Sequence, residues 1–254
     1  MDIDISKDSG VLTLTFNRLE KKNAITAAMY QSLADALKDA EADATVRAVL
    51  IAGQPQIFTA GNDLDDFLKN PPSGADSPVF QFMQRMIDCS KPTIAAVAGP
   101  AVGIGTTLLL HCDLVYAAEN ARLSMPFSQL GLCPEFASSL LLPQLAGSQR
   151  AAEKLLLGEP FLAAEACAMG LVNRVLPADE LLPFARAQAA KLVALPASSV
   201  RATKRLMKAD QVAAIKARIM EENLAFGTML GTREAKEAFA AFFEKRKPDF
   251  SRFA

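Results

Sequence analysis

Two glycine-containing segments carry most of the information in this chain: Phe58-Thr59-Ala60-Gly61-Asn62-Asp63-Leu64 and Ala98-Gly99-Pro100-Ala101-Val102-Gly103-Ile104-Gly105. Each follows a short run of β-branched and small apolar residues, at positions 48–52 and 93–97. Because glycine lacks a Cβ, a backbone can approach a ligand closely at such turns. Two turns of this kind can aim two main-chain N–H groups at one oxygen. Such an oxyanion hole is worth roughly 3–4 kcal/mol per donor in acyl chemistry.

The composition bounds the class of protein. The chain has 254 residues, enough for one large domain or for one domain with an appendage, and 51% of them are hydrophobic. Its net charge of −1 gives no electrostatic case for a nucleic-acid or anionic-membrane partner. No apolar run approaches the ~20 residues that span a bilayer. Acids in the first four residues do not fit a secretory signal, and residues 251–254 are no peroxisomal address, so we expect a cytoplasmic protein.

The numbers and positions of cysteine and histidine argue against a metal site and against a Ser-His-Asp triad. The four cysteines lie far apart and form no Cys-x-x-Cys pair: Cys89, Cys112, Cys133 and Cys167. This spacing predicts reduced thiols in a cytosolic protein, with no metal site. His111 is the single histidine, and a Ser-His-Asp triad or most catalytic zinc sites would have to use it. Its place after the apolar run 108–110 favours a histidine in the last turn of a helix, near the negative end of the dipole.

The first half of the chain alternates strand and helix patterns. Strands are predicted at residues 11–16, 48–52, 93–97 and 113–117, and helices at 79–89 and 104–111. Thr26 is a predicted N-cap for another helix, whose apolar face carries Met29, Leu33, Ala36, Leu37 and Ala40. Residues 71–78, Pro-Pro-Ser-Gly-Ala-Asp-Ser-Pro, continue neither a helix nor a strand and predict a mobile loop.

Helical patterns dominate after Ser124. One further strand is predicted at 171–175, behind the stop signal Gly170. Beyond Pro196 the pattern predicts three helices, at 198–208, 212–230 and 233–246. Strands alternating with helices in the first two thirds imply parallel β/α units, followed by an all-α appendage, so the fold class is α/β.

The chain resembles the crotonase superfamily, the enoyl-CoA hydratases and isomerases, along nearly its whole length. Beyond the two glycine segments, the matching segments are residues 17–24, 112–113, 125–127, 131–135, 163–166, 170–172 and 242–246. The resemblance implies a spiral of β/β/α units over residues 1–195 that carries an acyl-CoA site. It also implies a C-terminal α-helical region, 196–254, that mediates assembly of a trimer or a dimer of trimers. No cofactor is implied beyond the coenzyme A of the substrate.

The resemblance also assigns an oxyanion hole and questions one reaction. Its two backbone N–H donors would belong to Asn62 and Ile104, and Ile104 would add the positive end of a helix dipole. Hydratases of the family use two glutamates, and the matching positions here hold Thr107 and Phe127. Neither side chain is a general acid or base at neutral pH, which puts ordinary hydratase activity in doubt.

Glu135 supplies a different carboxylate. It matches the single catalytic glutamate of the peroxisomal-type Δ3,Δ2-enoyl-CoA isomerases. It would take a proton from C2 of a 3-enoyl thioester and return it at C4. An apolar pocket around Glu135 would raise its pKa. Without the resemblance, the residue pattern favours a solvent-facing or helix-N-terminal glutamate beside Pro134 over a catalytic one.

The resemblance places the coenzyme A contacts at both ends of the chain. The implied substrate-binding residues are Lys22, Ala24, Ala60, Gly61, Asp63, Leu64, Gly103 and Phe127, with Phe242 and Lys245 reaching in from a neighbouring subunit. Asp63 favours capping the following turn over reacting. The basic residues at this end are Arg18, Lys21, Lys22, Lys245, Arg246 and Lys247, and for each of them a solvated surface cation remains an alternative.

Other functions remain open. A second activity of the superfamily, hydratase-like or an aryl-CoA dehalogenase, is the nearest alternative, and a non-catalytic acyl-CoA-binding protein would keep the glycine turns without needing Glu135. A dinucleotide-binding turn at Gly103-Ile104-Gly105 fits poorly, because Leu108 stands where the third glycine would be.

Overall fold

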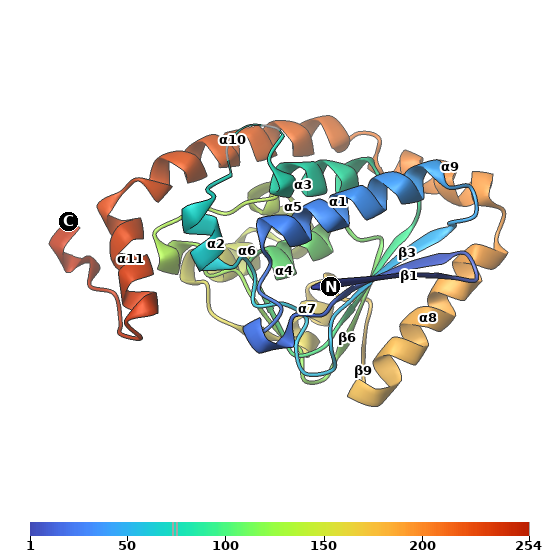
Figure 1. Cartoon of the computed structure of the whole chain (residues 1–254), viewed down its shortest axis with the longest axis horizontal. Helices are drawn as coiled ribbons and strands as arrows, with labels where there is room; N and C mark the ends of the chain where they lie inside the picture. Colours follow the sequence, from blue (N-terminus) through green and yellow to red (C-terminus); the bar gives the residue numbers. More distant parts are fainter. Residues whose placement is uncertain (73, 75, 254) are drawn as a thin grey trace.

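The computed structural model describes residues 1–72, 74 and 76–253, and its main feature is a six-stranded sheet (Figure 1). The strands, in spatial order, are β1 (Ile3–Asp8), β2 (Val11–Phe16), β3 (Ala48–Ala52), β4 (Thr93–Val97), β6 (Leu114–Ala118) and β9 (Arg174–Leu176). β1 and β2 form an antiparallel hairpin, and every other neighbouring pair is parallel. The predicted β/α class is confirmed, with β1 as an edge strand that the sequence pattern did not predict.

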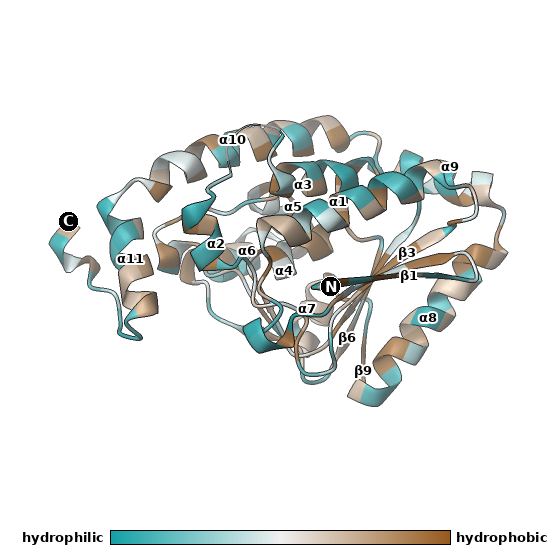
Figure 2. Ribbon diagram, in the orientation of Figure 1, coloured by the Kyte–Doolittle hydropathy of each residue, from teal (hydrophilic) through white to brown (hydrophobic). Residues whose placement is uncertain are grey.

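Helices cover both faces of this sheet, which is why β3 and β4 are buried along their whole length. Val49 and Ile51 point into the larger apolar cluster, shared with α1 (Ala27–Ala42) and α3 (Pro78–Asp88). Leu50 and Ala52 alternate with them and join a second cluster against α8 (Ala178–Ala194). In Figure 2 the strands are correspondingly brown at the centre of the molecule, while α1 carries its hydrophilic residues on the outside.

A second, three-stranded sheet brings the two glycine segments together. It contains β5 (Pro100–Val102), β7 (Arg122–Ser124) and β8 (Phe161–Leu162). An isolated parallel bridge joins Thr59 to Ala101, and another joins Ile25 to Asn62. None of these pairings was predicted, because strands of two or three residues are too short for an alternating pattern to reveal.

Two predicted elements, the helix at 104–111 and the strand at 113–117, differ from the structure in type or bounds. The helix expected at 104–111 is one α-helical turn, α4 (Ile104–Thr107), followed by a 3₁₀ turn, η2 (Leu108–His111). The Cys112 N–H bonds back to the Leu109 carbonyl, and this tighter turn lets β6 begin two residues later. The strand expected at 113–117 is therefore shifted by one residue.

The prediction of a strand at 171–175 was wrong for its first half. Gly170 does end α7 (Ala163–Ala168), with φ of 85°. The next two amides, of Leu171 and Val172, then bond back to the Ala166 carbonyl at the end of that helix. Because this capping occupies them, the chain joins the sheet only at β9.

The helix prediction around Thr26 is confirmed: its hydroxyl accepts from the Met29 N–H, and all five predicted apolar positions of α1 are buried. The remaining short elements are η1 (Leu19–Lys21), α2 (Leu64–Lys69), η3 (Ser128–Leu130), α5 (Ser138–Ala146), α6 (Ser148–Ala152) and a π-helical turn, η4 (Glu153–Leu157). Of the loop predicted at 71–78, Pro78 is the first residue of α3, and residues 73 and 75 lie outside the described part of the chain.

Three helices and a short turn follow Pro196: α9 (Ala197–Lys208), α10 (Val212–Leu230), α11 (Arg233–Phe243) and η5 (Phe250–Phe253). In Figure 1, α10 (orange-red) runs along the top of the molecule above α3 and α5, and α11 (red) lies at the left, on the side of α2. The predicted end of α11 at Arg246 was three residues too far. Lys245 adopts φ of 54°, and the Arg246 N–H bonds back to the Ala241 carbonyl, which ends the helix.

All four cysteines are free thiols, as predicted. Across residues 1–72, 74 and 76–253, no helix is both long and apolar enough to cross a bilayer.

A buried ion pair fastens α9 to the sheet. The Asp113 carboxylate, just before β6, lies 2.7 Å from Lys204 Nζ and 2.9 Å from Lys208 Nζ. It also accepts hydrogen bonds from the N–H and hydroxyl of Thr93. Burial alone would raise the pKa of this carboxyl, but the two lysines hold it below its ordinary value.

We predict that Asp113→Ala destabilises the protein by about 3 kcal/mol, because it leaves the Lys204 ammonium buried without its partner. Urea unfolding followed by circular dichroism measures this loss. Asp210→Ala, which removes an exposed carboxylate just after α9, should change the free energy of unfolding by less than about 0.5 kcal/mol. Equal effects of the two substitutions would contradict the anchoring role.

Candidate active site

The two glycine segments meet backbone to backbone. Gly61 has φ of 85°, and a Cβ built on it would lie 2.7 Å from the Val102 carbonyl oxygen. The Val102 N–H donates to the Thr59 carbonyl at 3.0 Å, which holds the segments in register. Only glycine permits both the left-handed backbone and the close approach at position 61.

Where the Gly61 and Val102 backbones meet, two backbone amides, those of Asn62 and Ile104, remain free beside one cavity. Ile104 N is at the first position of α4, where a helix has no internal partner for its N–H. Asn62 N faces away from the Ile25 bridge, whose hydrogen bonds use Gly61 O and Asp63 N. Within the described part of the chain, neither amide donates to another residue. Both residues line one cavity of about 780 Å³. Two free amides in such a place can bind a developing oxyanion.

Most of the predicted substrate-binding residues line this same cavity. They are Lys22, Ala24, Ala60, Gly61, Asp63, Leu64, Gly103, Phe127 and Phe242. Lys245 is not among the lining residues and is exposed beyond the end of α11. Phe242 lines the cavity of its own chain. Its predicted reach into a neighbouring subunit is not tested by a single chain.

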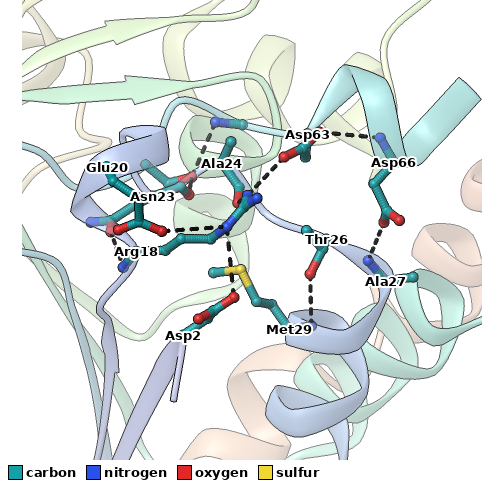
Figure 3. Close-up of polar contacts among 12 residues, drawn as sticks. Asp2, Arg18, Glu20, Asn23, Ala24, Thr26, Ala27, Met29, Asp63 and Asp66 are labelled. Carbon is teal, nitrogen blue, oxygen red and sulfur yellow. Dashed lines mark hydrogen bonds and ion pairs between the residues drawn. The ribbon is translucent and has the colours of Figure 1, made fainter.

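Asp63 acts as a cap, as the sequence favoured. Its carboxylate accepts the Asp66 N–H at 3.1 Å, at the start of α2, and lies 2.7 Å from Arg18 Nη1 (Figure 3). Arg18 Nη1 also donates to the Ala24 carbonyl at 2.9 Å. Asp66 in turn accepts the Ala27 N–H at the start of α1. These contacts fix the backbone on both sides of Asn62.

The basic residues predicted for the coenzyme A end divide into two groups. Arg18 is occupied by Asp63, and Arg246 pairs with Glu237 and Glu244. Lys21, Lys22 and Lys247 line the cavity and take part in none of the ion pairs found in the described residues. Among the described residues, the cavity-lining cations outside any ion pair are therefore these three lysines.

Glu135 is buried, with 6% of its surface exposed, so a solvent-facing glutamate is ruled out. One of its oxygens, Oε1, accepts a hydrogen bond from the Thr107 hydroxyl at the end of α4. The Glu135 carboxyl group is thereby fixed one helical turn from Ile104. Glu135 does not itself line the cavity, although Phe127 and Leu132 of the same loop region do.

The electrostatics of Glu135 follow from its burial. Loss of hydration raises the pKa of this carboxyl to about 8, against the opposing hydrogen bond from Thr107. The nearby carboxylate of Glu222 adds a smaller upward contribution. A glutamate with such a pKa is a stronger base than an exposed one, which is what proton abstraction from carbon requires.

The two residues after Glu135 adopt an uncommon backbone. Phe136 and Ala137 both have φ of 56°, a left-handed conformation that costs roughly 1 kcal/mol or more per residue without glycine. His111 donates from Nε2 to the Phe136 carbonyl at 2.8 Å and stacks on the Phe136 ring. Burial lowers the pKa of His111 to about 4, so the ring is neutral. His111 thus ends its helix as predicted, but it supports the Glu135 turn.

Tyr30 is a site residue that the sequence analysis missed. It sits on the buried face of α1 and donates its hydroxyl to Asn62 Oδ1 at 2.5 Å. Burial, and next the Glu135 charge, raise the pKa of the Tyr30 phenol. The only sequence signal was a polar tip within an apolar helical stripe, which is common at core positions.

Comparison with known proteins agrees with this site. The chain matches the family model for enoyl-CoA hydratase/isomerase over residues 6–252. Enoyl-CoA delta isomerase 2 of Rattus norvegicus is 36% identical over 250 residues, which cover 96% of this chain but only 63% of the rat protein. The 2,3-dehydroadipyl-CoA hydratase of Escherichia coli (strain K12) is 33% identical over 250 residues and 98% of both chains.

Solved structures give the same fold. The structure of Pseudomonas aeruginosa OdaA superposes with a TM-score of 0.93 at 51% identity, covering 95% of this chain and 98% of that one. An enoyl-CoA hydratase/isomerase from Pseudoalteromonas atlantica T6c gives 0.94 at 42% identity, covering 98% of this chain and all of that one. The chain is therefore a crotonase-fold enzyme. It belongs to the enoyl-CoA hydratase/isomerase family, near the isomerases.

We predict that Glu135→Gln stabilises the fold at alkaline pH. The native state holds the Glu135 proton more tightly than the unfolded chain, so stability falls as pH rises from the ordinary pKa of 4.5 to about 8. Glutamine removes this loss. The free energy of unfolding of the variant minus that of wild type should grow from about pH 5 to about pH 9 in urea titrations. A difference that does not change with pH would contradict the assigned pKa.

Proposed function

We propose that this enzyme is a Δ3,Δ2-enoyl-CoA isomerase in which Glu135 is the single acid/base group. One observation carries the proposal. The buried carboxylate of Glu135 is hydrogen bonded to Thr107, on the short helix whose first amide, Ile104 N, is free. The position that matches a hydratase glutamate thus holds the hydroxyl that anchors the isomerase base.

The proposed reaction needs one group that removes a proton and then returns it. Glu135 takes a proton from C2 of a 3-enoyl thioester, and the electron pair delocalises onto the thioester oxygen as a dienolate. The N–H groups of Asn62 and Ile104 hold that oxygen. The dienolate then collapses, C4 takes the proton from Glu135, and the double bond lies between C2 and C3. No water is consumed and no atom is gained.

The side chains around the amides support isomerisation over hydration. Hydration requires a group that activates water and a group that delivers a proton. Phe127 lines the cavity at one of the matching positions and can do neither. Thr107 is occupied by Glu135. The matched proteins include one named as an isomerase and one named as a hydratase, so overall similarity does not favour either reaction, and these side chains are what supports isomerisation.

Coenzyme A binding is part of the proposal. The cavity lining includes Lys21, Lys22 and Lys247, whose charges suit the phosphates of the nucleotide. Phe242 from α11 lines the same cavity. Assembly through the region 196–254 into trimers or dimers of trimers, a cytoplasmic location and the absence of a further cofactor complete the proposal.

A second candidate function, a non-catalytic acyl-CoA-binding protein, is favoured by one observation. Glu135 does not line the cavity, so isomerisation requires its carboxylate to gain contact with the acyl group when a thioester binds. A binding protein has no such requirement. The activity measurement below separates the two functions.

We predict that Glu135→Gln lowers kcat for isomerisation of 3-enoyl-CoA thioesters by about 10²- to 10⁴-fold. Binding of acyl-CoA should change by less than about threefold, since the amides and the lysines remain. The decisive assay follows conversion of 3-enoyl-CoA to 2-enoyl-CoA, with hydration of 2-enoyl-CoA measured in parallel.

The control is Glu180→Gln, which removes an exposed carboxylate from α8 on the opposite face of the sheet. It should behave as wild type. Unchanged isomerisation by Glu135→Gln would overturn the isomerase proposal. A wild type that binds acyl-CoA but converts neither substrate would establish the binding protein instead.

We predict that Thr107→Val shifts the pH profile of isomerisation to higher pH. The Thr107 hydrogen bond favours the ionised form of Glu135, so its loss raises the pKa of this carboxyl further. The rising limb of kcat/KM should move up by about one pH unit. Thr107→Ser keeps the donor and should leave the limb near that of wild type. A limb that stays in place in both variants would show that Glu135 is not the titrating base.

A further inference from the structure

The C-terminal helix α10 delivers a second buried carboxylate to the segment that follows Glu135. Glu222, 5% exposed, accepts the Ala137 N–H at 2.6 Å through Oε2. Its other oxygen, Oε1, accepts the Ser139 N–H at 3.1 Å and the Ser139 hydroxyl at 2.6 Å. All three donors belong to the left-handed turn or to the first turn of α5.

Glu222 occupies a place where the helix would otherwise be apolar. The buried or half-buried side of α10 contains Ile215, Ile219, Phe226, Met229 and Leu230, with a spacing of seven residues between Ile219 and Phe226. Glu222 lies in the middle of this stripe. An unpaired carboxylate there would be costly, so its presence requires the donors of the Glu135 turn. A glutamate within an apolar helical stripe can be seen in the sequence, but it is a weak signal. Its neighbour Glu221 is an ordinary exposed acid, and the sequence does not distinguish the two.

The turn has few other restraints. Ser138 donates its N–H and its hydroxyl to the Glu135 carbonyl, and His111 holds the Phe136 carbonyl. Among residues 1–72, 74 and 76–253, Glu222 is the one hydrogen-bond acceptor for Ala137 N. Since Phe136 and Ala137 are both left-handed, their strained backbone directs the side chain of Glu135 toward Thr107 only while these contacts persist.

We propose that Glu222 is a positioning residue for Glu135: its carboxylate fixes the Phe136–Ala137 turn and places a negative charge beside the base. This inference rests on the proposed isomerase function. Glu222 does not line the cavity and does not touch the substrate. Its effect on the reaction passes through Glu135.

Several charged or titratable groups lie around Glu135 and Glu222. They are Tyr30 on α1, Cys133 before the turn and Arg218 on α10, together with His111 on η2, which holds the Phe136 carbonyl and itself faces Lys208 on α9. Burial has the largest effect and raises the pKa of Glu222 above its ordinary value, although hydrogen bonds from Ser139 and Ala137 and the charge of Arg218 oppose it. Three donors, two of them backbone amides at a helix N-terminus, favour the ionised form of Glu222.

The test compares Glu222→Gln with wild type in the 3-enoyl-CoA assay over a range of pH. Loss of the charge lowers the pKa of Glu135, so the rising limb of kcat/KM should move to lower pH by about one unit. Loss of the turn contacts should lower the alkaline plateau of kcat by about ten- to hundredfold, with KM within about twofold. A merely structural role would lower the plateau without moving the limb.

Two further variants sharpen the result. Glu222→Asp keeps the charge but shortens the reach, so its plateau should fall while its limb stays near that of wild type. Glu221→Gln removes the neighbouring exposed charge and should leave both within about twofold of wild type, because solvent screens it. A wild-type plateau in Glu222→Asp, or a wild-type limb in Glu222→Gln, would overturn the proposal.

A readout without substrate separates this inference from the proposed function. The pH dependence of the stability difference between wild type and Glu135→Gln reports the pKa of Glu135 in the fold. The same difference, measured in the Glu222→Gln background, should have a midpoint about one unit lower. An unchanged midpoint overturns the role of Glu222. Absence of isomerisation in wild type, with a shifted midpoint, overturns only the proposed function.

Discussion

The approach of the Gly61 backbone to the Val102 carbonyl constrains both halves of the site. Any side chain at position 61 would separate the two segments, and the amides of Asn62 and Ile104 would no longer share one wall. Other parts of the fold hold the Gly61 and Val102 backbones together. β3 and β4 deliver the segments to the same edge of the sheet, and the Thr59–Ala101 bridge fixes their register. Arg18 and Asp63 hold the loop from outside (Figure 3).

Two opposing effects determine the pKa of Glu135. Burial favours its neutral form and Thr107 favours its ionised form, and burial has the larger effect. The result is a carboxyl group whose pKa is raised to about 8 in the interior of the protein. Burying Glu135 in this way is accompanied by backbone strain at Phe136 and Ala137. Contacts from His111 and Glu222 hold this strained turn. Strain of this kind is typical of functional segments.

Much of this arrangement could be predicted from the sequence. β3 and β4 are continuous apolar runs, and Thr26 sits at the correct offset before an amphipathic stripe, so local pattern sufficed. The pairing of β5, β7 and β8 could not be predicted, because each strand is too short to carry a pattern and depends on partners distant in sequence. Tyr30 and Glu222 were missed for a related reason: each looks like an ordinary member of its helix until the facing loop is known.

The seclusion of Glu135 has a consequence for the fate of the hydrogen atom that it handles. Glu135 is only 6% exposed, and a carboxyl group so shielded from bulk water exchanges its proton with solvent slowly compared with a fast neighbouring reaction step. In the proposed isomerisation, the nucleus lifted from one carbon is therefore the nucleus set down two carbons away. A hydrogen isotope introduced at C2 would therefore be retained at C4 of the product. The transfer would be intramolecular, without exchange with solvent.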